Sequence, residues 1–287
     1  MSADRVQAVA YLDAHNHLQD EWLAPHLDQA CRQLEELGLR RAVVNGTCEA
    51  DWDRVTGLAL RYAWVVPSYG LHPWLVGNRT DGWYAKLVER LDADPRAGVG
   101  EIGLDRWILE SARKDDVRLA GLRRASLDEQ LAVFRQQLGL ATERNLPMTV
   151  HCLDAWGALQ AVFAETPLPA RGFLLHAYGG SLELAQQFVR RGAYFSFNGY
   201  FLGERKEKQQ RVFRELPLDR LLVETDAPSM PPPQAWRTYR LPPAPAGSPL
   251  NHPCNIEAVY SGLASLLKIP VGELSDRVEE NFQRLFG

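Results

Sequence analysis

The chain has 287 residues, of which 46% are hydrophobic and 24% charged, and its formal net charge at pH 7 is −4. This composition indicates a folded globular protein, and a single domain spanning residues 1–287 accounts for the length. No stretch approaches the roughly 18 consecutive apolar residues of a membrane helix, and the charge lacks the basic excess of a typical nucleic-acid-binding domain, although a local basic cluster is compatible with it.

Short apolar runs alternate with longer amphipathic segments along the chain. The runs are residues 9–12, 41–45, 63–69, 98–102, 147–150, 172–175, 194–197 and 221–223. The segments with helical spacing are residues 25–37, 127–145, 155–163, 181–190 and 257–267. This alternation predicts βαβ units around a parallel sheet. Eight runs favour closure into an α/β fold of the (β/α)8 TIM-barrel type, with an open doubly wound sheet as the alternative.

Two segments have no periodic pattern. Residues 228–253 are rich in proline, and we expect a rigid loop over an active site there rather than a linker between domains, because helical sequence resumes only after Asn255. Residues 110–124 are charged and weakly patterned, and we expect an excursion from the barrel. No internal repeat divides the chain.

Polar residues cluster at the carboxyl ends of the predicted strands. Five of the seven histidines lie at or just after these ends: His15, His17, His72, His151 and His176. In a (β/α)8 barrel the strand ends share one rim, where side chains from distant positions converge. His15 and His17 are two residues apart on an extended segment, so both side chains project from one face and form a bidentate metal site. A histidine on its own is more often a core residue.

Two carboxylates complete the candidate site. Glu101 lies within an apolar, glycine-flanked run, where a carboxylate must be paired or bound to a metal. Asp226 ends the last predicted strand. The alternatives are a salt bridge to an arginine for Glu101 and a helix N-cap role for Asp226.

Four imidazoles and two carboxylates can hold two divalent ions about 3.5–4 Å apart. We predict that His15, His17 and Asp226 bind one ion, that His151 and His176 bind the other, and that Glu101 bridges them. Imidazole favours zinc and other transition metals, whereas carboxylates favour Mg²⁺ or Mn²⁺. No lysine lies in a predicted strand, which excludes a carbamylated lysine as the bridge.

These segments, in this order, resemble the signatures of the TatD family of metal-dependent deoxyribonucleases. The matching segments are Asp13-Ala14-His15-Asn16-His17, Gly70-Leu71-His72-Pro73, Gly100-Glu101-Ile102-Gly103-Leu104-Asp105, His151, His176 and Glu224-Thr225-Asp226-Ala227-Pro228. The resemblance spans nearly the whole chain. It implies a barrel of the amidohydrolase type, two divalent ions, and hydrolysis of single-stranded DNA from the 3′ end. It also places the six predicted ligands at the family's ligand positions, and His72 where the substrate phosphate is met.

The chain departs from the family pattern at three places. Leu153 stands where an arginine is usual, Tyr178 stands where phenylalanine is common, and residues 251–255 replace an arginine-containing segment. An arginine at position 153 could bind a phosphate through two hydrogen bonds. Its replacement favours a second hypothesis, hydrolysis of a small amide, ester or lactone by the same centre. A third hypothesis is a barrel that binds a ligand without catalysis, which the complete ligand set disfavours.

The expected mechanism assigns Asp226 to orient the attacking water and take its proton, and His72 to stabilise the developing charge. Trp74 and Trp107, together with Trp22 and Trp236, are expected in loops after strands, where they either stack on bases or simply cover the barrel. A basic run at residues 205–211 is expected to be a solvated helix face. The four cysteines include no CxxC pair, which indicates reduced thiols and a cytoplasmic protein. Nothing predicts an obligate protein partner.

Overall fold

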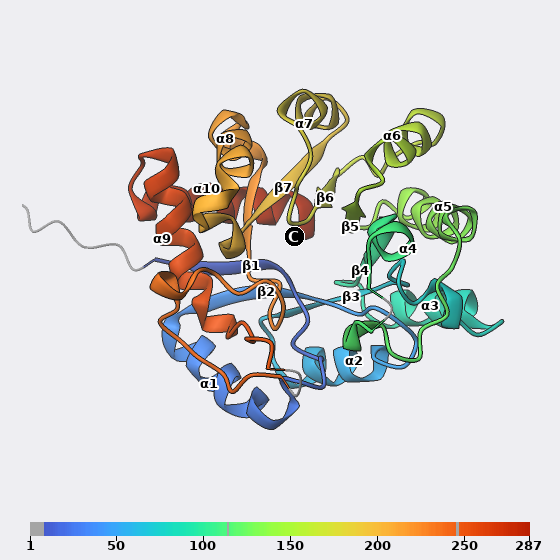
Figure 1. Ribbon diagram of the computed structural model, residues 1–287, viewed down its shortest axis with the longest axis horizontal. Helices are drawn as coiled ribbons and strands as arrows, with labels where there is room; N and C mark the ends of the chain where they lie inside the picture. Colours follow the sequence, from blue (N-terminus) through green and yellow to red (C-terminus); the bar gives the residue numbers. More distant parts are fainter. Residues whose placement is uncertain (1–8, 114, 245–246) are drawn as a thin grey trace, which may run out of the picture.

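Eight parallel strands form one sheet in the order β1 to β8, and helices surround it (Figure 1). The computed structural model describes residues 9–113, 115–244 and 247–287. The strands are β1 (Tyr11–Asn16), β2 (Leu39–Asn45), β3 (Val65–Tyr69), β4 (Gly98–Asp105), β5 (Met148–Leu153), β6 (Phe173–Leu175), β7 (Ala193–Asn198) and β8 (Leu221–Glu224).

The last strand returns to the first at the carboxyl end of the sheet. The backbone N–H of Asp226 donates to the His15 carbonyl at 2.9 Å, and the N–H of His17 donates to the Ala227 carbonyl at 2.8 Å. These bonds bring the loop after β8 against β1. The predicted (β/α)8 barrel is therefore confirmed, and the open doubly wound alternative is wrong.

Helices follow the strands along the chain. They are α1 (Leu27–Leu37), α2 (Trp52–Arg61), α3 (Trp83–Ala93), α4 (Trp107–Glu110), α5 (Leu127–Glu143), α6 (Trp156–Glu165), α7 (Leu182–Val189), α8 (Glu207–Glu215), α9 (Ile256–Leu267) and α10 (Val271–Phe286). Short 3₁₀ turns are η1 (Ala24–His26), η2 (Val76–Asn78), η3 (Val117–Leu119), η4 (Gly199–Leu202), η5 (Glu204–Lys206), η6 (Leu218–Arg220), η7 (Gln234–Trp236) and η8 (Pro253–Asn255).

The helix termini follow local sequence signals. At the start of α5, the side chains and backbones of Ser126 and Glu129 form a reciprocal capping box, which satisfies two otherwise free N–H groups. Helix α1 ends at Gly38, whose φ of +90° is the left-handed conformation that favours glycine. The predicted helical segments agree with α1, α5, α6, α7 and α9 to within two residues at each end, and α1 is preceded by η1.

Three strands extend three or four residues beyond the carboxyl ends of their predicted apolar runs. Strands β1, β4 and β5 continue through polar residues, so His15 and His151 lie inside strands rather than after them. Pairing persists there, with Gly103 opposite His151. A strand lining a barrel can carry polar side chains at its carboxyl end without losing its backbone ladder, so hydrophobicity alone underestimates its length.

Close approach of β4 and β5 requires a glycine at position 103. A Cβ atom there would lie 1.9 Å from the carbonyl oxygen of His151, and the φ of Gly103 is +148°. No side chain fits in that space. Gly103 therefore lets β4, which carries Glu101, pack directly against β5, which carries His151.

The two unpatterned segments connect elements of the barrel. The proline-rich segment 228–253 contains η7 and is tied to the loop before α9 by paired hydrogen bonds between Tyr239 and Asn255, of 3.0 and 3.1 Å. In segment 110–124, Arg124 donates to the Ile108 carbonyl at 3.0 Å. Among the described residues, none of the helices has the length and apolar character needed to cross a membrane.

Candidate metal centre

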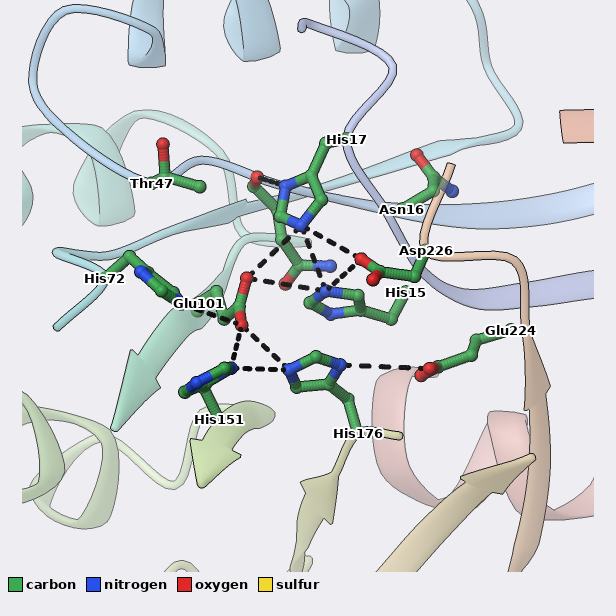
Figure 2. Close-up of polar contacts among 12 residues, drawn as sticks. His15, Asn16, His17, Thr47, His72, Glu101, His151, His176, Glu224 and Asp226 are labelled. Carbon is green, nitrogen blue, oxygen red and sulfur yellow. Dashed lines mark hydrogen bonds and ion pairs between the residues drawn. The ribbon is translucent and has the colours of Figure 1, made fainter. Parts of the chain in front are cut away.

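The six predicted ligands converge at the carboxyl end of the barrel (Figure 2). Glu101 lies between the other five. Glu101 Oε2 lies 3.5 Å from His15 Nε2 and 3.2 Å from His17 Nε2. Glu101 Oε1 lies 3.0 Å from His151 Nδ1 and 2.8 Å from His176 Nε2. The two oxygens of one buried carboxylate therefore face two different pairs of imidazoles.

The first pair comes from the end of β1. His15 and His17 point toward one another, with their Nε2 atoms 3.2 Å apart, as their spacing predicts. His17 Nδ1 lies 2.8 Å from the Asn45 carbonyl, which can only accept a hydrogen bond, so Nδ1 carries a proton and Nε2 is the nitrogen that faces the carboxylates.

Asp226 faces this first pair from the opposite side to Glu101. Its Oδ1 lies 3.5 Å from His15 Nε2 and 3.3 Å from His17 Nε2. The backbone φ of Asp226 is +53°, a left-handed conformation that aspartate tolerates better than most residues. This turn directly after β8 brings the carboxylate to the histidines of β1.

The second pair comes from the ends of β5 and β6. His151 Nδ1 and His176 Nε2 are 3.2 Å apart. His151 Nε2 donates to Asp105 Oδ2 at 3.0 Å, which leaves Nδ1 as the nitrogen directed at Glu101. His176 Nδ1 lies 3.8 Å from Glu224 Oε1. The carboxylate of Glu224 accepts hydrogen bonds from the Ser196 hydroxyl and from Asn198 Nδ2.

His72 approaches the same Glu101 oxygen as the second pair. Its Nε2 lies 3.3 Å from Glu101 Oε1, and its ring packs edge-on against His151 with centroids 4.5 Å apart. Burial lowers the pKa of His72 below its ordinary value, because the charges around it do not compensate for lost hydration. His72 is therefore a neutral ring at the edge of the cluster.

The pKa values of Glu101 and His151 are strongly shifted by the groups around them. Burial alone would raise the pKa of Glu101, but His72, His176 and His15 outweigh it and hold that pKa well below the ordinary value. Burial alone would lower the pKa of His151, but hydrogen bonds to Asp105 and Glu101 raise it to about 9. Protons on the imidazoles thus balance buried negative charge, as bound cations would.

This arrangement fits divalent metal ions. Two nitrogen donors bound to one zinc-like ion at about 2.0–2.1 Å, with roughly tetrahedral angles, lie about 3.3 Å apart. The two histidine pairs have separations of 3.2 Å. In His17 and His151 a hydrogen bond fixes the far nitrogen as a donor, so the near nitrogen is the one that can offer a lone pair to an ion once its own proton leaves. The residues that surround Glu101 are metal-ligand types, and among the residues that the structure describes no arginine pairs with this carboxylate, contrary to the alternative of a salt bridge.

Two buried acids near the centre carried no predicted role of their own. Asp105 is fully buried and contacts His151, and Glu224 is fully buried and faces His176. Both end an apolar strand, which is the pattern that singled out Glu101 and Asp226. The same reasoning could therefore have assigned them roles. Of the five lysines, the four that the structure describes lie outside the strands; Lys114 lies outside the described residues.

The two tryptophans predicted to contact substrate lie side by side, and one of them, Trp74, packs against His72. Trp74 and Trp107 stack with centroids 5.8 Å apart, and Trp74 also packs edge-on against His72 at 5.5 Å. Leu153, at the end of β5, has 39% of its surface exposed. Arg205, Lys208 and Arg211 are exposed on η5 and α8, as expected for a solvated helix face.

A TIM barrel with imidazoles and carboxylates gathered at the carboxyl ends of its strands is the architecture of metal-dependent hydrolases. The family model described as TatD related DNase matches residues 12–287. The chain belongs to this family and is a metal-dependent hydrolase that acts on ester bonds.

Relatives of similar length support this assignment. The chain is 28% identical over 274 residues to the uncharacterized metal-dependent hydrolase YabD of Bacillus subtilis, covering 96% of this chain and 98% of YabD. It is 28% identical over 260 residues to a protein of Cronobacter turicensis named 3′-5′ ssDNA/RNA exonuclease TatD, covering 90% and 91% of the two chains. The crystal structure of YjjV, a TatD homologue from Escherichia coli, superposes with a TM-score of 0.79 at 26% identity, covering 96% of this chain and 97% of YjjV.

Proposed function

We propose that this protein is a two-metal phosphodiesterase that removes nucleotides from the 3′ end of single-stranded DNA. The observation that carries the proposal is the position of Glu101, whose two oxygens face separate pairs of imidazoles at 2.8–3.5 Å. A carboxylate in this position suits a bridge between two cations.

In this proposal, each ion has its own ligands. His15, His17 and Asp226 would hold one ion, His151 and His176 would hold the other, and Glu101 would serve both. Mg²⁺, Mn²⁺ and Zn²⁺ are the candidates, because the set combines imidazole with carboxylate donors. When bound, the ions supply charge stabilisation at phosphoryl oxygens and lower the pKa of a water molecule.

Two side chains carry the remaining chemistry. Burial would raise the pKa of Asp226, but His15 and His17 hold it below the ordinary value, so Asp226 is an ionised carboxylate at neutral pH. It can orient the attacking water and accept its proton. His72, neutral and facing Glu101, donates a hydrogen bond to the phosphate as negative charge develops there.

The choice of DNA as substrate rests on relatives and on aromatic side chains. The Cronobacter turicensis relative is named an ssDNA/RNA exonuclease, and a human relative, 26% identical over 292 residues, is named deoxyribonuclease TATDN3. The stacked, partly exposed rings of Trp74 and Trp107 offer apolar faces beside the proposed metal site. Stacking of a base on such a ring contributes about 1–3 kcal/mol. The proposal also includes a reducing, cytoplasmic location, because all four cysteines have free thiols.

A second candidate is hydrolysis of a small amide, ester or lactone. The exposed side chain of Leu153, at the end of β5, supports it, because an apolar rim suits an uncharged substrate better than a phosphate. The test is a panel of 3′-labelled and 5′-labelled single-stranded oligonucleotides, duplex DNA, RNA, bis-nitrophenyl phosphate and simple amides, each with Mg²⁺, Mn²⁺ or Zn²⁺. We expect release of mononucleotides from the 3′ end, absent in His151→Ala. Turnover of amides alone would favour the second candidate, and absence of any metal-dependent turnover would favour a binding barrel.

A further inference from the structure

A chain of two hydrogen bonds links an aromatic side chain at the mouth of the site to one of the proposed metal ligands. Trp74 Nε1 donates to Asp105 Oδ2 at 2.6 Å, and His151 Nε2 donates to the same oxygen at 3.0 Å. Asp105 is fully buried. Trp74 follows β3, Asp105 ends β4 and His151 lies in β5, so the chain ties three neighbouring barrel segments together.

Asp105 has little freedom to reorient. Its other oxygen, Oδ1, accepts from the backbone N–H of Ile108 at 2.9 Å. Its backbone N–H donates to Gln130 Oε1 at 2.8 Å, and its carbonyl accepts from Gln130 Nε2 at 3.0 Å. Hydrogen bonds thus hold Asp105 at its side chain and at both of its backbone groups. A residue held in this way fixes the position of the His151 ring that donates to it.

His151 therefore has its ring orientation set from behind. With Nε2 donating to Asp105, Nδ1 is the nitrogen that faces Glu101, at 3.0 Å, and that can bind an ion once its proton leaves. A carboxylate behind a metal-bound histidine fixes the tautomer and raises the basicity of the ligand nitrogen. Here Asp105 also accepts a hydrogen bond from the indole N–H of Trp74. An indole nitrogen can only donate, so Trp74 cannot itself bind the metal ion.

Trp74 also belongs to a surface that an incoming molecule can touch. Its ring is partly exposed, stacks on Trp107 at 5.8 Å and packs edge-on against His72 at 5.5 Å. The guanidinium of Arg118 lies 5.6 Å from the Trp74 ring and 5.3 Å from the Trp107 ring. Trp107 shares the stack, but its Nε1 makes no hydrogen bond within the described residues.

We propose that Trp74 and Asp105 are positioning residues that hold His151 in its ligand orientation, and that contact of substrate with the Trp74 ring is thereby coupled to metal affinity. This inference rests on the proposed two-metal function, since it assigns His151 as a ligand. Trp74 differs from Trp107 in one respect that matters: only Trp74 is joined to Asp105. The pair therefore provides a matched comparison.

The experiment measures Mn²⁺ affinity by isothermal titration calorimetry on chelator-treated protein: wild type, Trp74→Phe, Trp107→Phe and Asp105→Asn. Each substitution to Phe keeps an aromatic ring and removes one N–H. We expect Asp105→Asn to weaken Mn²⁺ binding about 10–100-fold, as loss of such supporting carboxylates does, and Trp74→Phe to weaken it about 3–10-fold. Trp107→Phe should bind Mn²⁺ within about twofold of wild type, because it removes no bond to the ligand.

Kinetics add a second readout. Both variants should raise KM for an oligonucleotide, because Phe offers less stacking area than Trp. Only Trp74→Phe should in addition lower kcat at subsaturating Mn²⁺ and recover as Mn²⁺ is raised. Equal Mn²⁺ affinities in Trp74→Phe and Trp107→Phe would overturn the inference and leave the proposed function standing. A wild-type protein that binds no divalent ion would overturn both. If Asp105→Asn fails to fold, judged by circular dichroism, the tryptophan pair decides alone.

Discussion

His72 accepts a hydrogen bond at Nδ1 from the backbone N–H of Trp74, at 3.2 Å. Because an acceptor nitrogen carries no proton, the proton of the neutral ring lies on Nε2, which is 3.3 Å from Glu101 Oε1. Burial lowers the pKa of His72, which keeps the ring neutral at pH 7. His72 can therefore donate a hydrogen bond through Nε2, and it does so as a neutral ring and not as a cation.

The first prediction concerns this donor. His72→Ala should lower kcat about 100-fold, in the range that loss of one oxyanion donor produces, while the number of bound metal ions stays the same. Steady-state kinetics and elemental analysis of the same preparation test both statements. His26→Ala, a histidine outside the cluster, is the control. Loss of one metal equivalent in His72→Ala would instead make His72 a ligand.

The second prediction concerns Asp226. Asp226→Asn should retain metal with reduced affinity but lower kcat about 10³-fold, because an amide cannot accept the proton of the attacking water. The matched control is Asp219→Asn, which changes an aspartate with 61% of its side chain exposed. Single-turnover measurements at saturating metal separate the two effects. Undiminished turnover in Asp226→Asn would remove this residue from the chemistry.

The third prediction concerns pH. In the metal-free protein, His151 keeps its proton up to a pKa of about 9, whereas the unfolded reference is about 6.5. This stabilisation is fully present below the unfolded value and is lost as pH rises through the folded one. A divalent ion must displace the same proton, so its apparent affinity should rise between these two pH values.

Calorimetric titrations with Mn²⁺ in two buffers of different ionisation enthalpy measure the protons released. We expect net proton release at pH 7 that diminishes toward pH 9. Metal binding with no change in protonation at pH 7 would contradict the pKa assigned to His151.

The fourth prediction concerns Leu153, which is exposed where the family pattern has arginine. If the substrate is an oligonucleotide, Leu153→Arg should lower KM about 3–10-fold, because a guanidinium can bind phosphate through two hydrogen bonds. Leu153→Lys and Leu153→Gln distinguish general charge from this geometry and from simple loss of the apolar side chain. Loss of small-ester turnover in Leu153→Arg, without any gain on DNA, would instead support the second candidate substrate class, because that class favours the apolar rim.

Much of the fold follows from the sequence because the strands are nearly continuous apolar runs with polar residues at one end. Helices α2, α3, α4 and α10 were not predicted, although the buried residues of α2 and α10 recur at helical spacing. Helix α8 buries only Val212 and Phe213, too few apolar positions to show a period.

The six proposed metal ligands could be predicted because each interrupts or ends an apolar run. A polar side chain there is buried and must be paired or bound to a metal. The bond from Trp74 to Asp105 could not be predicted, because the direction of an indole N–H depends on how the loops after β3 and β4 pack. Sequence spacing fixes which residues share a rim, whereas the tautomers of His17 and His151 depend on acceptors from other strands.

The central claim is that Glu101 bridges two cations, and anomalous diffraction from crystals grown with Mn²⁺ tests it most directly. We expect two anomalous peaks about 3.5–4 Å apart, one beside His15, His17 and Asp226 and the other beside His151 and His176, with one Glu101 oxygen on each. A single peak, or two peaks that Glu101 does not join, would contradict the account.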